Sequence, residues 1–142
     1  MFAGSGGIGI EALSRGACFA VFVDSSRDCA KVIQENLNFT KLNTKAEVML
    51  RDSMSAISTL ALREKEPFDL IFMDPPYNKG LEKEALIALR NTSLVSEDTI
   101  LIFEADIKTD ISFINEIGYE LLKQKTYKTN QHVWLKVKSE AL

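Results

Sequence analysis

The chain has 142 residues, 46% of them apolar and 26% charged, with a net charge of −3. This composition excludes a disordered, collagen-like or membrane-spanning protein, and the length predicts a single domain over residues 1–142. The acidic balance argues against a dedicated nucleic-acid-binding module, and the first residues lack the pattern of a signal peptide, so we expect a cytoplasmic protein.

Short apolar runs alternate along the chain with segments whose apolar residues recur at helical spacing. In chain order we predict a helix from near residue 7, a strand at 20–23, a helix at 27–42, a strand at 46–50, a helix at 53–63, a strand at 68–73, a helix at 82–90, a strand at 99–103 and a short helix at 111–114. Two extended runs at 119–126 and 133–137, joined by 128–131, predict a hairpin. The alternation indicates an α/β fold whose mostly parallel sheet ends in an antiparallel edge.

A glycine-rich segment at 4–9, Gly-Ser-Gly-Gly-Ile-Gly, matches the G-x-G-x-x-G pattern, and Asp24 ends a strand about 20 residues later. Glycines let the backbone approach a ligand, and a helix that begins near Gly7 directs its first amides at it. An acid at the end of the second strand can accept hydrogen bonds from both ribose hydroxyls. The pattern indicates a nucleoside-containing cofactor, although a glycine-rich helix cap fits it too. Because no strand precedes the loop, the first strand of such a sheet is expected to be missing here.

Two further acids end strands at the same edge of the predicted sheet as Asp24. Asp52 can accept a hydrogen bond from the exocyclic amine of an adenine, or it can cap the helix that starts at Ser53, and the sequence leaves both roles open. Asp74 begins the tetrapeptide Asp-Pro-Pro-Tyr, whose prolines remove amide donors and leave carbonyls free to accept. Acceptors beside the flat ring of Tyr77 suit a planar substrate with an amino group, so we favour a site here over a rigid turn.

The remaining polar and reactive side chains are mostly interpreted as structural or solvated. Cys18 and Cys29 match no metal-ligand spacing and His132 is the only histidine, so no metal site is expected. Lys79 lies where a phosphate of a nucleic-acid substrate could bind, and Glu104 ends a strand where it either faces the same site or caps. Other basic and aromatic residues are expected to be solvated or to pack in the hairpin: Lys83, Lys108, Lys123, Lys125, Lys128, His132 and Trp134.

Three segments together resemble the RsmD-type methyltransferases. They are Phe-Ala-Gly-Ser-Gly at 2–6, Gly-Ile-Glu-Ala-Leu-Ser-Arg-Gly-Ala at 9–17 and Phe-Asp-Leu-Ile-Phe-Met-Asp-Pro-Pro-Tyr at 68–77. The resemblance runs over essentially the whole chain and implies a Rossmann-like, class I S-adenosylmethionine-dependent methyltransferase fold, with strand order 3-2-1-4-5-7-6 and strand seven antiparallel. It also implies methylation of the N2 amine of a guanine in 16S small-subunit ribosomal RNA. Family members carry a basic N-terminal stretch and a first strand ahead of the glycine loop, and a glycine where Lys128 stands, and this sequence departs from them at both points.

The resemblance further implies roles for individual residues. The cofactor-binding residues would be Ala3, Gly4, Ser5 and Gly6 around the methionine moiety and ribose, Asp24 and Ser25 at the ribose hydroxyls, and Asp52 and Ser53 at the adenine. The catalytic residues would be Asp74, Pro75, Pro76 and Tyr77. Asp74 and the Pro75 carbonyl would accept hydrogen bonds from the guanine amine, with Tyr77 stacked on the base. The implied cofactor is S-adenosylmethionine, and the implied partner is ribosomal RNA or the assembling small ribosomal subunit, with no membrane partner.

Three other functions fit parts of the pattern. Methylation of the N6 amine of adenine in DNA or RNA would use the same tetrapeptide, because that amine needs the same acceptors. A nicotinamide-dependent oxidoreductase would use the glycine pattern with Asp24, although the segment at 74–77 argues against it. A catalytically inactive, methyltransferase-like fragment that only binds or scaffolds is indicated by the missing first strand.

Overall fold

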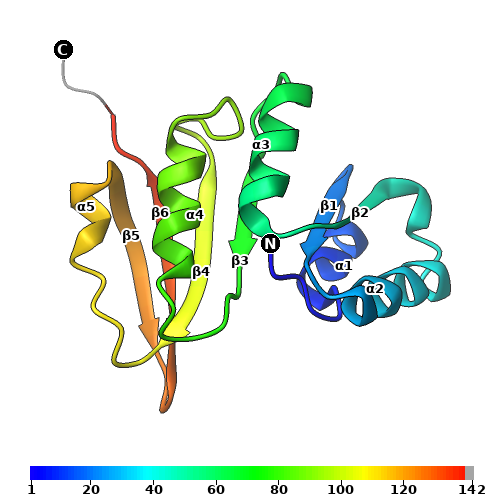
Figure 1. Ribbon diagram of the computed structural model, residues 1–142, viewed down its shortest axis with the longest axis horizontal. Helices are drawn as coiled ribbons and strands as arrows, with labels where there is room; N and C mark the ends of the chain where they lie inside the picture. Colours follow the sequence, from blue (N-terminus) through cyan, green and yellow to red (C-terminus); the bar gives the residue numbers. More distant parts are fainter. Residues whose placement is uncertain (140–142) are drawn as a thin grey trace. The chain divides into compact units, whose positions relative to one another are not determined.

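The computed structural model describes residues 1–139, and they form two compact units: Met1–Ala56 and the residues from Ile57 onward (Figure 1). Each unit has its own β-sheet. A bilayer-crossing helix would have to be longer and more apolar than any helix in this part of the chain. The single-domain organisation suggested by the length stays a prediction.

The first unit contains a two-stranded parallel sheet flanked by helices. Its elements are α1 (Gly7–Ser14), β1 (Ala20–Asp24), α2 (Arg27–Phe39), the 3-10 turn η1 (Asn43–Lys45), β2 (Ala46–Leu50) and the start of α3 (Ser53–Arg63). A core of four buried side chains joins both helices to β1: Leu13, Phe22, Ile33 and Leu37. The strands pair from Ala20 with Ala46 to Asp24 with Leu50. Asp24 and the residues after Leu50 therefore lie at one edge of this sheet, as predicted.

The helix predicted at 27–42 ends earlier, at Phe39. Lys41 adopts a left-handed conformation with a φ of 61°, and the Leu42 amide donates to the Leu37 carbonyl at 3.0 Å. This hydrogen bond belongs to a Schellman motif, in which a left-handed residue ends a helix. Apolar spacing does not reveal the ending, because Leu42 still falls at a helical position.

The second unit is built on a four-stranded sheet with the order β3-β4-β6-β5. Its elements are the rest of α3, β3 (Leu70–Met73), α4 (Leu81–Arg90), β4 (Ile100–Asp106), α5 (Phe113–Glu116), β5 (Tyr119–Thr126) and β6 (Asn130–Val137). β3 and β4 are parallel, whereas β6 is antiparallel to both β4 and β5. The predicted hairpin is confirmed, while β3 and α5 each begin two residues later than predicted.

The lengths of the last strands differ from the predicted ones because pairing sets them. β4 continues to Asp106, beyond the predicted end at 103, since β6 pairs with it as far as Asn130. The hairpin connection is correspondingly shorter than the predicted 128–131. The Tyr127 amide donates to the Asn130 carbonyl at 2.8 Å and closes the turn.

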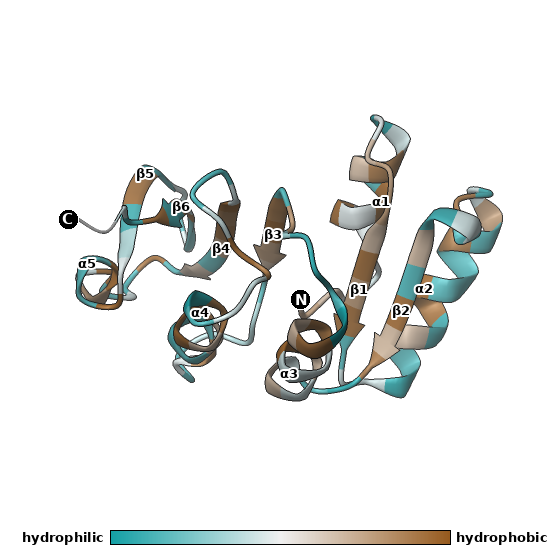
Figure 2. Cartoon of the chain, turned by 90° about the horizontal axis from the view of Figure 1, so that it is seen from above, coloured by the Kyte–Doolittle hydropathy of each residue, from teal (hydrophilic) through white to brown (hydrophobic). Residues whose placement is uncertain are grey.

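The four-stranded sheet has one face covered by α4 and α5 and one face that these helices do not cover (Figure 2). Alternate residues of β4 and β6 are buried on one side of the sheet: Leu101, Phe103, Ala105, Gln131, Val133, Leu135 and Val137. The hydroxyl of the buried Tyr119 donates to the Leu86 carbonyl at 2.6 Å and ties β5 to α4. Because strand side chains alternate between faces, Glu104 and His132 lie on the opposite side of the sheet from the buried set.

The two strand orders match the order that the family resemblance implies once its first strand is left out. The order 3-2-1-4-5-7-6 then separates into 3-2 and 4-5-7-6, which correspond to β2-β1 and β3-β4-β6-β5. No strand precedes α1 within residues 1–139. The strands accordingly form two sheets instead of the single predicted sheet.

Gly9 is required for the packing of α1 on β1. A Cβ at this position would lie 2.3 Å from Cε1 of the buried Phe22 ring, far inside van der Waals contact. We expect Gly9→Ala to lower the free energy of unfolding by about 1–3 kcal/mol, the usual cost of overpacking a core. Denaturant unfolding measures the change, with Gly7→Ala as the matched control, because a Cβ there meets only the Ser5 hydroxyl at 3.7 Å. Equal stability of the two variants would contradict this packing.

Candidate functional site

The glycine-rich loop is held against the end of β1 by backbone hydrogen bonds and by Asp24. The Ala3 amide donates to the Val23 carbonyl at 3.0 Å. The Gly4 amide donates to Asp24 Oδ2 at 3.0 Å, and the Ser26 amide donates to Oδ1 at 2.9 Å. The loop and the acid that the sequence predicts to share a cofactor are therefore in direct contact within the first unit.

Glycine is needed at two positions of the loop because the backbone is left-handed there. The φ angles are 58° at Gly4 and 80° at Gly6, where other residues are strained. Gly6 precedes α1, and no side chain caps this start of the helix. No side chain therefore occupies the first backbone amides of α1. These amides must be open in a helix start that binds an anion or a ligand. The Ser5 carbonyl accepts the Asn36 side-chain amide at 2.9 Å, which fixes the loop on α2.

Asp24 keeps acceptor capacity for a ligand. A carboxylate offers about four lone-pair sites, and the two backbone amides that Asp24 accepts occupy one on each oxygen. The remaining lone pairs suit the hydroxyls of a ribose, the contact expected of an acid at the end of this strand. Ser25 lies beside Asp24 and is exposed.

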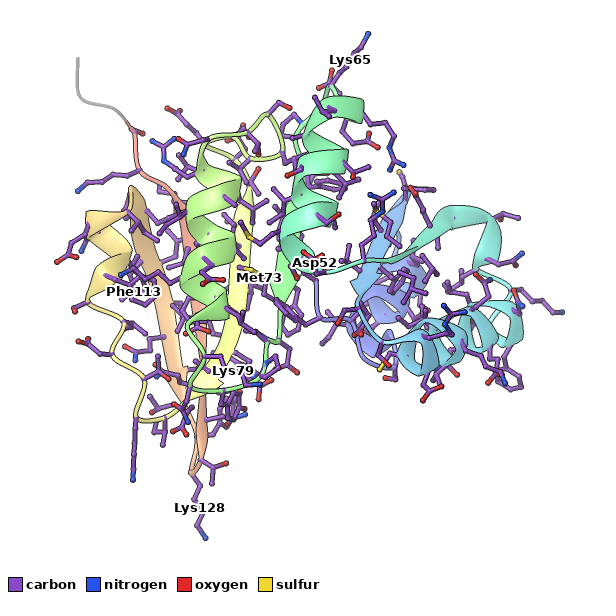
Figure 3. The ribbon with its side chains drawn as sticks, in the orientation of Figure 1. Asp52, Lys65, Met73, Lys79, Phe113 and Lys128 are labelled. Atoms are coloured by element: carbon purple, nitrogen blue, oxygen red, sulfur yellow. The ribbon has the colours of Figure 1, made fainter. Side chains whose placement is uncertain are left out.

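Asp52 stands at the same edge of the first sheet and caps α3 (Figure 3). Its Oδ1 accepts the Ser55 amide at 2.9 Å, which is N-cap geometry. The Arg51 amide donates to the Asp24 carbonyl at 3.0 Å and joins the ends of β1 and β2. The capping role is thus confirmed. The adenine contact expected of Asp52 and Ser53 stays a prediction. The second carboxylate oxygen of Asp52 is suited to accept a hydrogen bond from the adenine amine.

The segment Asp74–Tyr77 follows β3 directly and is tied to β4 by its tyrosine. The Tyr77 hydroxyl donates to Glu104 Oε1 at 2.6 Å. Pro75 is buried, whereas the other three residues of the segment are exposed. Asn78 then adopts a left-handed conformation with a φ of 63°, which turns the chain toward α4. The segment therefore presents a carboxylate and an anchored ring together at the end of β3.

Glu104 is the centre of a polar cluster on the face of the sheet that α4 and α5 do not cover. Its Oε1 accepts both the Tyr77 hydroxyl and the Asn130 side-chain amide. Its Oε2 lies 3.7 Å from Nε2 of His132, which the β4–β6 register places directly opposite. The cluster therefore connects the Asp74–Tyr77 segment to the C-terminal hairpin.

The surroundings of Asp74 and Glu104 shift the pKa values of these two carboxyls in opposite directions. Partial burial of its carboxyl raises the pKa of Asp74 and the negative charge of Glu104 raises it further, while a protonated His132 would oppose them. Burial also acts to raise the pKa of Glu104, but hydrogen bonds from Tyr77 and Asn130 outweigh it and hold the pKa below its ordinary value. The hydrogen bond to Glu104 raises the pKa of Tyr77. These shifts move the titration of Asp74 to higher pH and that of Glu104 to lower pH.

The family model described as Conserved hypothetical protein 95 matches residues 1–136 of the chain. The chain belongs to this family. A relative described as a putative rRNA methyltransferase, YlbH of Bacillus subtilis, is 36% identical over 78% of this chain and 60% of its own length. Ribosomal RNA small subunit methyltransferase D of Haemophilus influenzae is 32% identical over 88% of this chain and 63% of its own length. The resemblance to RsmD-type methyltransferases is confirmed, although the chain spans less than two thirds of these relatives.

Several solved structures share the fold of this chain. A conserved hypothetical protein from Streptococcus pyogenes is 31% identical, with a TM-score of 0.81 over 97% of this chain and 82% of that one. A putative methylase from Haemophilus influenzae is 26% identical, with a TM-score of 0.83 over 97% and 84%. A SAM-dependent methyltransferase from Agrobacterium tumefaciens, 16% identical, has a TM-score of 0.72 over 96% and 54%. These likenesses confirm the predicted Rossmann-like methyltransferase fold.

In this family member the predicted site residues fall into two sets. The first unit holds Ala3, Gly4, Ser5, Gly6, Asp24, Ser25, Asp52 and Ser53, and the second holds Asp74, Pro75, Pro76 and Tyr77. Contacts within each unit connect the loop to Asp24 and Tyr77 to Glu104. The meeting of both sets around one ligand stays a prediction. Within residues 1–139, no group of three or more His, Cys, Asp or Glu side chains is arranged to hold a metal ion.

The sequence pattern only partly identified the polar cluster. It left Glu104 open between a site and a cap, it interpreted His132 as hairpin packing, and it did not single out Asn130. Polar and apolar residues alternate only at 103–106, a signal that could have placed Glu104 on a polar sheet face, whereas Asn130, Gln131 and His132 are three consecutive polar residues and give no such signal. Which residue faces which depends on the register between β4 and β6, and that register is not contained in either segment alone.

Proposed function

We propose that the chain uses S-adenosylmethionine to methylate the exocyclic N2 amine of a guanine in 16S small-subunit ribosomal RNA. The observation that carries the proposal is the Asp74–Tyr77 segment at the end of β3, with its ring anchored on Glu104. Support comes from the family membership and from relatives that are themselves named ribosomal RNA methyltransferases. The substrate is then ribosomal RNA, either free or within the assembling small subunit.

The first unit fits the nucleoside end of such a methyl donor. Nothing lies within 4 Å of the position of a Cβ on Gly4, and the start of α1 carries no side-chain cap. Asp24 has lone pairs for the ribose hydroxyls, and Asp52 stands at the same sheet edge for the adenine amine. A putative methyltransferase with the same fold, 14% identical at a TM-score of 0.75, is complexed with SAH. The sulfonium group of the donor supplies an electrophilic methyl.

Asp74 and the Pro75 carbonyl would act on the base amine. An aromatic amine is a weak nucleophile because its lone pair is delocalised into the ring. Acceptors for its two hydrogens would favour a pyramidal nitrogen and free its lone pair to take the methyl. The carbon–sulfur bond would break with S-adenosylhomocysteine as the leaving group, and the methylated nitrogen would lose one proton to Asp74 or to water. Since no covalent intermediate with the protein is needed, positioning and electrostatics supply most of the acceleration. Tyr77 offers a flat surface that holds the base in place.

Transfer of a labelled methyl group from S-adenosylmethionine to unmodified small-subunit ribosomal RNA tests this function. We expect the label on the N2 amine of guanine after digestion to nucleosides. Label on the N6 amine of adenine would instead support the adenine-specific alternative. Intact binding of S-adenosylhomocysteine without any transfer would support an inactive, methyltransferase-like chain. Calorimetric binding of NAD in its place would favour an oxidoreductase.

Asp24→Asn is expected to weaken the binding of S-adenosylhomocysteine by about tenfold or more. Asparagine has a single acceptor oxygen, so it cannot serve both the Gly4 and the Ser26 amides, and it loses the charge that strengthens bonds to ribose hydroxyls. Hydrogen bonds to charged groups contribute about 1.5–3 kcal/mol, and 1.4 kcal/mol corresponds to about tenfold in affinity. Titration calorimetry measures it, with Asp28→Asn, an exposed acid of α2, as the control. Equal affinities of the two variants would exclude Asp24 from the cofactor site.

A further inference from the structure

The hairpin of β5 and β6 carries three rings in a row on the sheet face that α4 and α5 do not cover. The ring of His132 lies 5.1 Å from that of Tyr127 and 6.0 Å from that of Trp134, edge to face with both. The β5–β6 register places Lys125 opposite His132 and Lys123 opposite Trp134, so these side chains share one face. We call Lys123, Lys125, Tyr127, His132 and Trp134 the hairpin face.

Two lysines of the hairpin face lie over its rings. Lys123 Nζ is 4.9 Å from the centroid of the Trp134 ring, and Lys125 Nζ is 5.3 Å from that of Tyr127. Both distances lie within the reach of about 6 Å for a cation–π interaction. Both lysines and Tyr127 are exposed, so the ammonium groups and part of this ring surface are open to solvent. The hairpin face therefore combines positive charge with ring surface.

The positive charge of the two lysines of the hairpin face is not neutralised by nearby acids. Across residues 1–139, neither Lys123 nor Lys125 forms a salt bridge, whereas Lys136 of β6 pairs with Glu120 at 3.8 Å. Lys128 extends from the tip of the hairpin and adds to this charge (Figure 3). The chain as a whole carries a net charge of −3. A local cluster of unpaired lysines on an acidic chain marks a surface for an anionic ligand.

Unpaired lysines interleaved with rings suit single-stranded nucleic acid, because phosphates bind the ammonium groups and bases stack on the rings. We propose that the hairpin face binds the single-stranded ribonucleotide segment next to the target base, an inference that rests on the proposed function. His132 connects this face to Tyr77, since both contact the carboxylate of Glu104. A strand bound along the hairpin leads to the ring on which the target base is expected to stack.

Trp134 is the only tryptophan of the chain, so its fluorescence reports on the hairpin face directly. Titration of the full chain with an unstructured RNA oligonucleotide is expected to quench this fluorescence to saturation. The anisotropy of a labelled copy of the same RNA gives the affinity independently. A chain that binds no RNA, or that binds it with unchanged Trp134 emission, would overturn the proposal.

The double variant Lys123→Gln/Lys125→Gln tests the contribution of charge, since glutamine keeps much of the side-chain length. Its matched control is Lys31→Gln/Lys45→Gln, which changes two exposed lysines of the first unit. Loss of two phosphate contacts to a single strand is expected to reduce the slope of log affinity against log salt concentration by about 1.4 and to weaken binding at low salt. The control should bind RNA like the unaltered chain. Equal slopes for both double variants would overturn the proposal.

Methyl transfer separates a failure of this inference from a failure of the proposed function. If RNA quenches Trp134 and the hairpin variant binds RNA weakly, but the unaltered chain transfers no methyl, the hairpin face binds RNA and the proposed function fails. If the unaltered chain and the hairpin variant both transfer methyl with the same KM for RNA, the proposed function stands and the inference about the hairpin face fails. Unchanged circular dichroism and S-adenosylhomocysteine affinity establish that the hairpin variant is folded.

Discussion

Replacing Asp74 with alanine is expected to lower the rate of methyl transfer by about 10²–10³-fold or more, the range for removal of one electrostatic contact to a transition state. The substitution removes the carboxylate proposed to accept a hydrogen bond from the base amine, and with it the bias toward a pyramidal nitrogen. Affinity for S-adenosylhomocysteine should be unchanged, because the hydrogen bonds that hold the glycine loop on Asp24 do not involve Asp74. Single-turnover transfer of a labelled methyl group measures the rate.

Asp69→Ala is the matched control for this experiment, since Asp69 is an exposed acid just before the other end of β3. It should transfer methyl at the rate of the unaltered chain. Asp74→Asn keeps one acceptor oxygen for the base amine but lacks the charge, so it is expected to transfer methyl more slowly than the unaltered chain and faster than the alanine variant. Normal turnover in Asp74→Ala would remove the proposed mechanism.

Local signals were sufficient to predict much of the fold. β2 and α3 have the predicted bounds, Ala46–Leu50 and Ser53–Arg63. The strand is a short run of apolar residues interrupted only by Glu47, and the helix begins where Asp52 caps it with a side-chain oxygen. The contact between the glycine loop and Asp24 agrees with the G-x-G-x-x-G pattern followed by an acid about 20 residues later, and the shared edge of Asp24 and Asp52 follows from the parallel pairing of β1 with β2.

Features that depend on pairing between distant residues could not be predicted in the same way. Glu104 meets His132 and Asn130 only because β6 pairs with β4 in one particular register. A shift by one residue would move the polar side chains of β6 to the helix-covered face. The sequence pattern therefore identified Glu104 as an acid at a strand end but did not decide whether it faces the site or caps the strand.

Glu104 is expected to set the pH dependence of methyl transfer through its charge. Glu104→Gln keeps an oxygen for the Tyr77 hydroxyl and the Asn130 amide but removes the negative charge. Because burial and then this charge raise the pKa of Asp74, the variant should lower that pKa toward its ordinary value. Asp74 has to be ionised for its proposed role, so the acidic limb of the kcat–pH profile should move to lower pH.

Glu104→Ala separates the orienting role of this carboxylate from its charge. Without an acceptor, the Tyr77 hydroxyl and the Asn130 amide lose their shared partner, and the Tyr77 ring loses the contact that fixes it. We expect kcat to fall by about 10²-fold over the whole pH range, since misplacement by about 1 Å can cost that much. Glu116→Gln on α5 is the exposed control and should leave the profile unaltered. Two results together would contradict a role of Glu104 in methyl transfer: an unshifted acidic limb in Glu104→Gln and normal rates in Glu104→Ala. The polar cluster would then only hold the hairpin, because neither the charge of Glu104 nor its hydrogen bonds would affect catalysis.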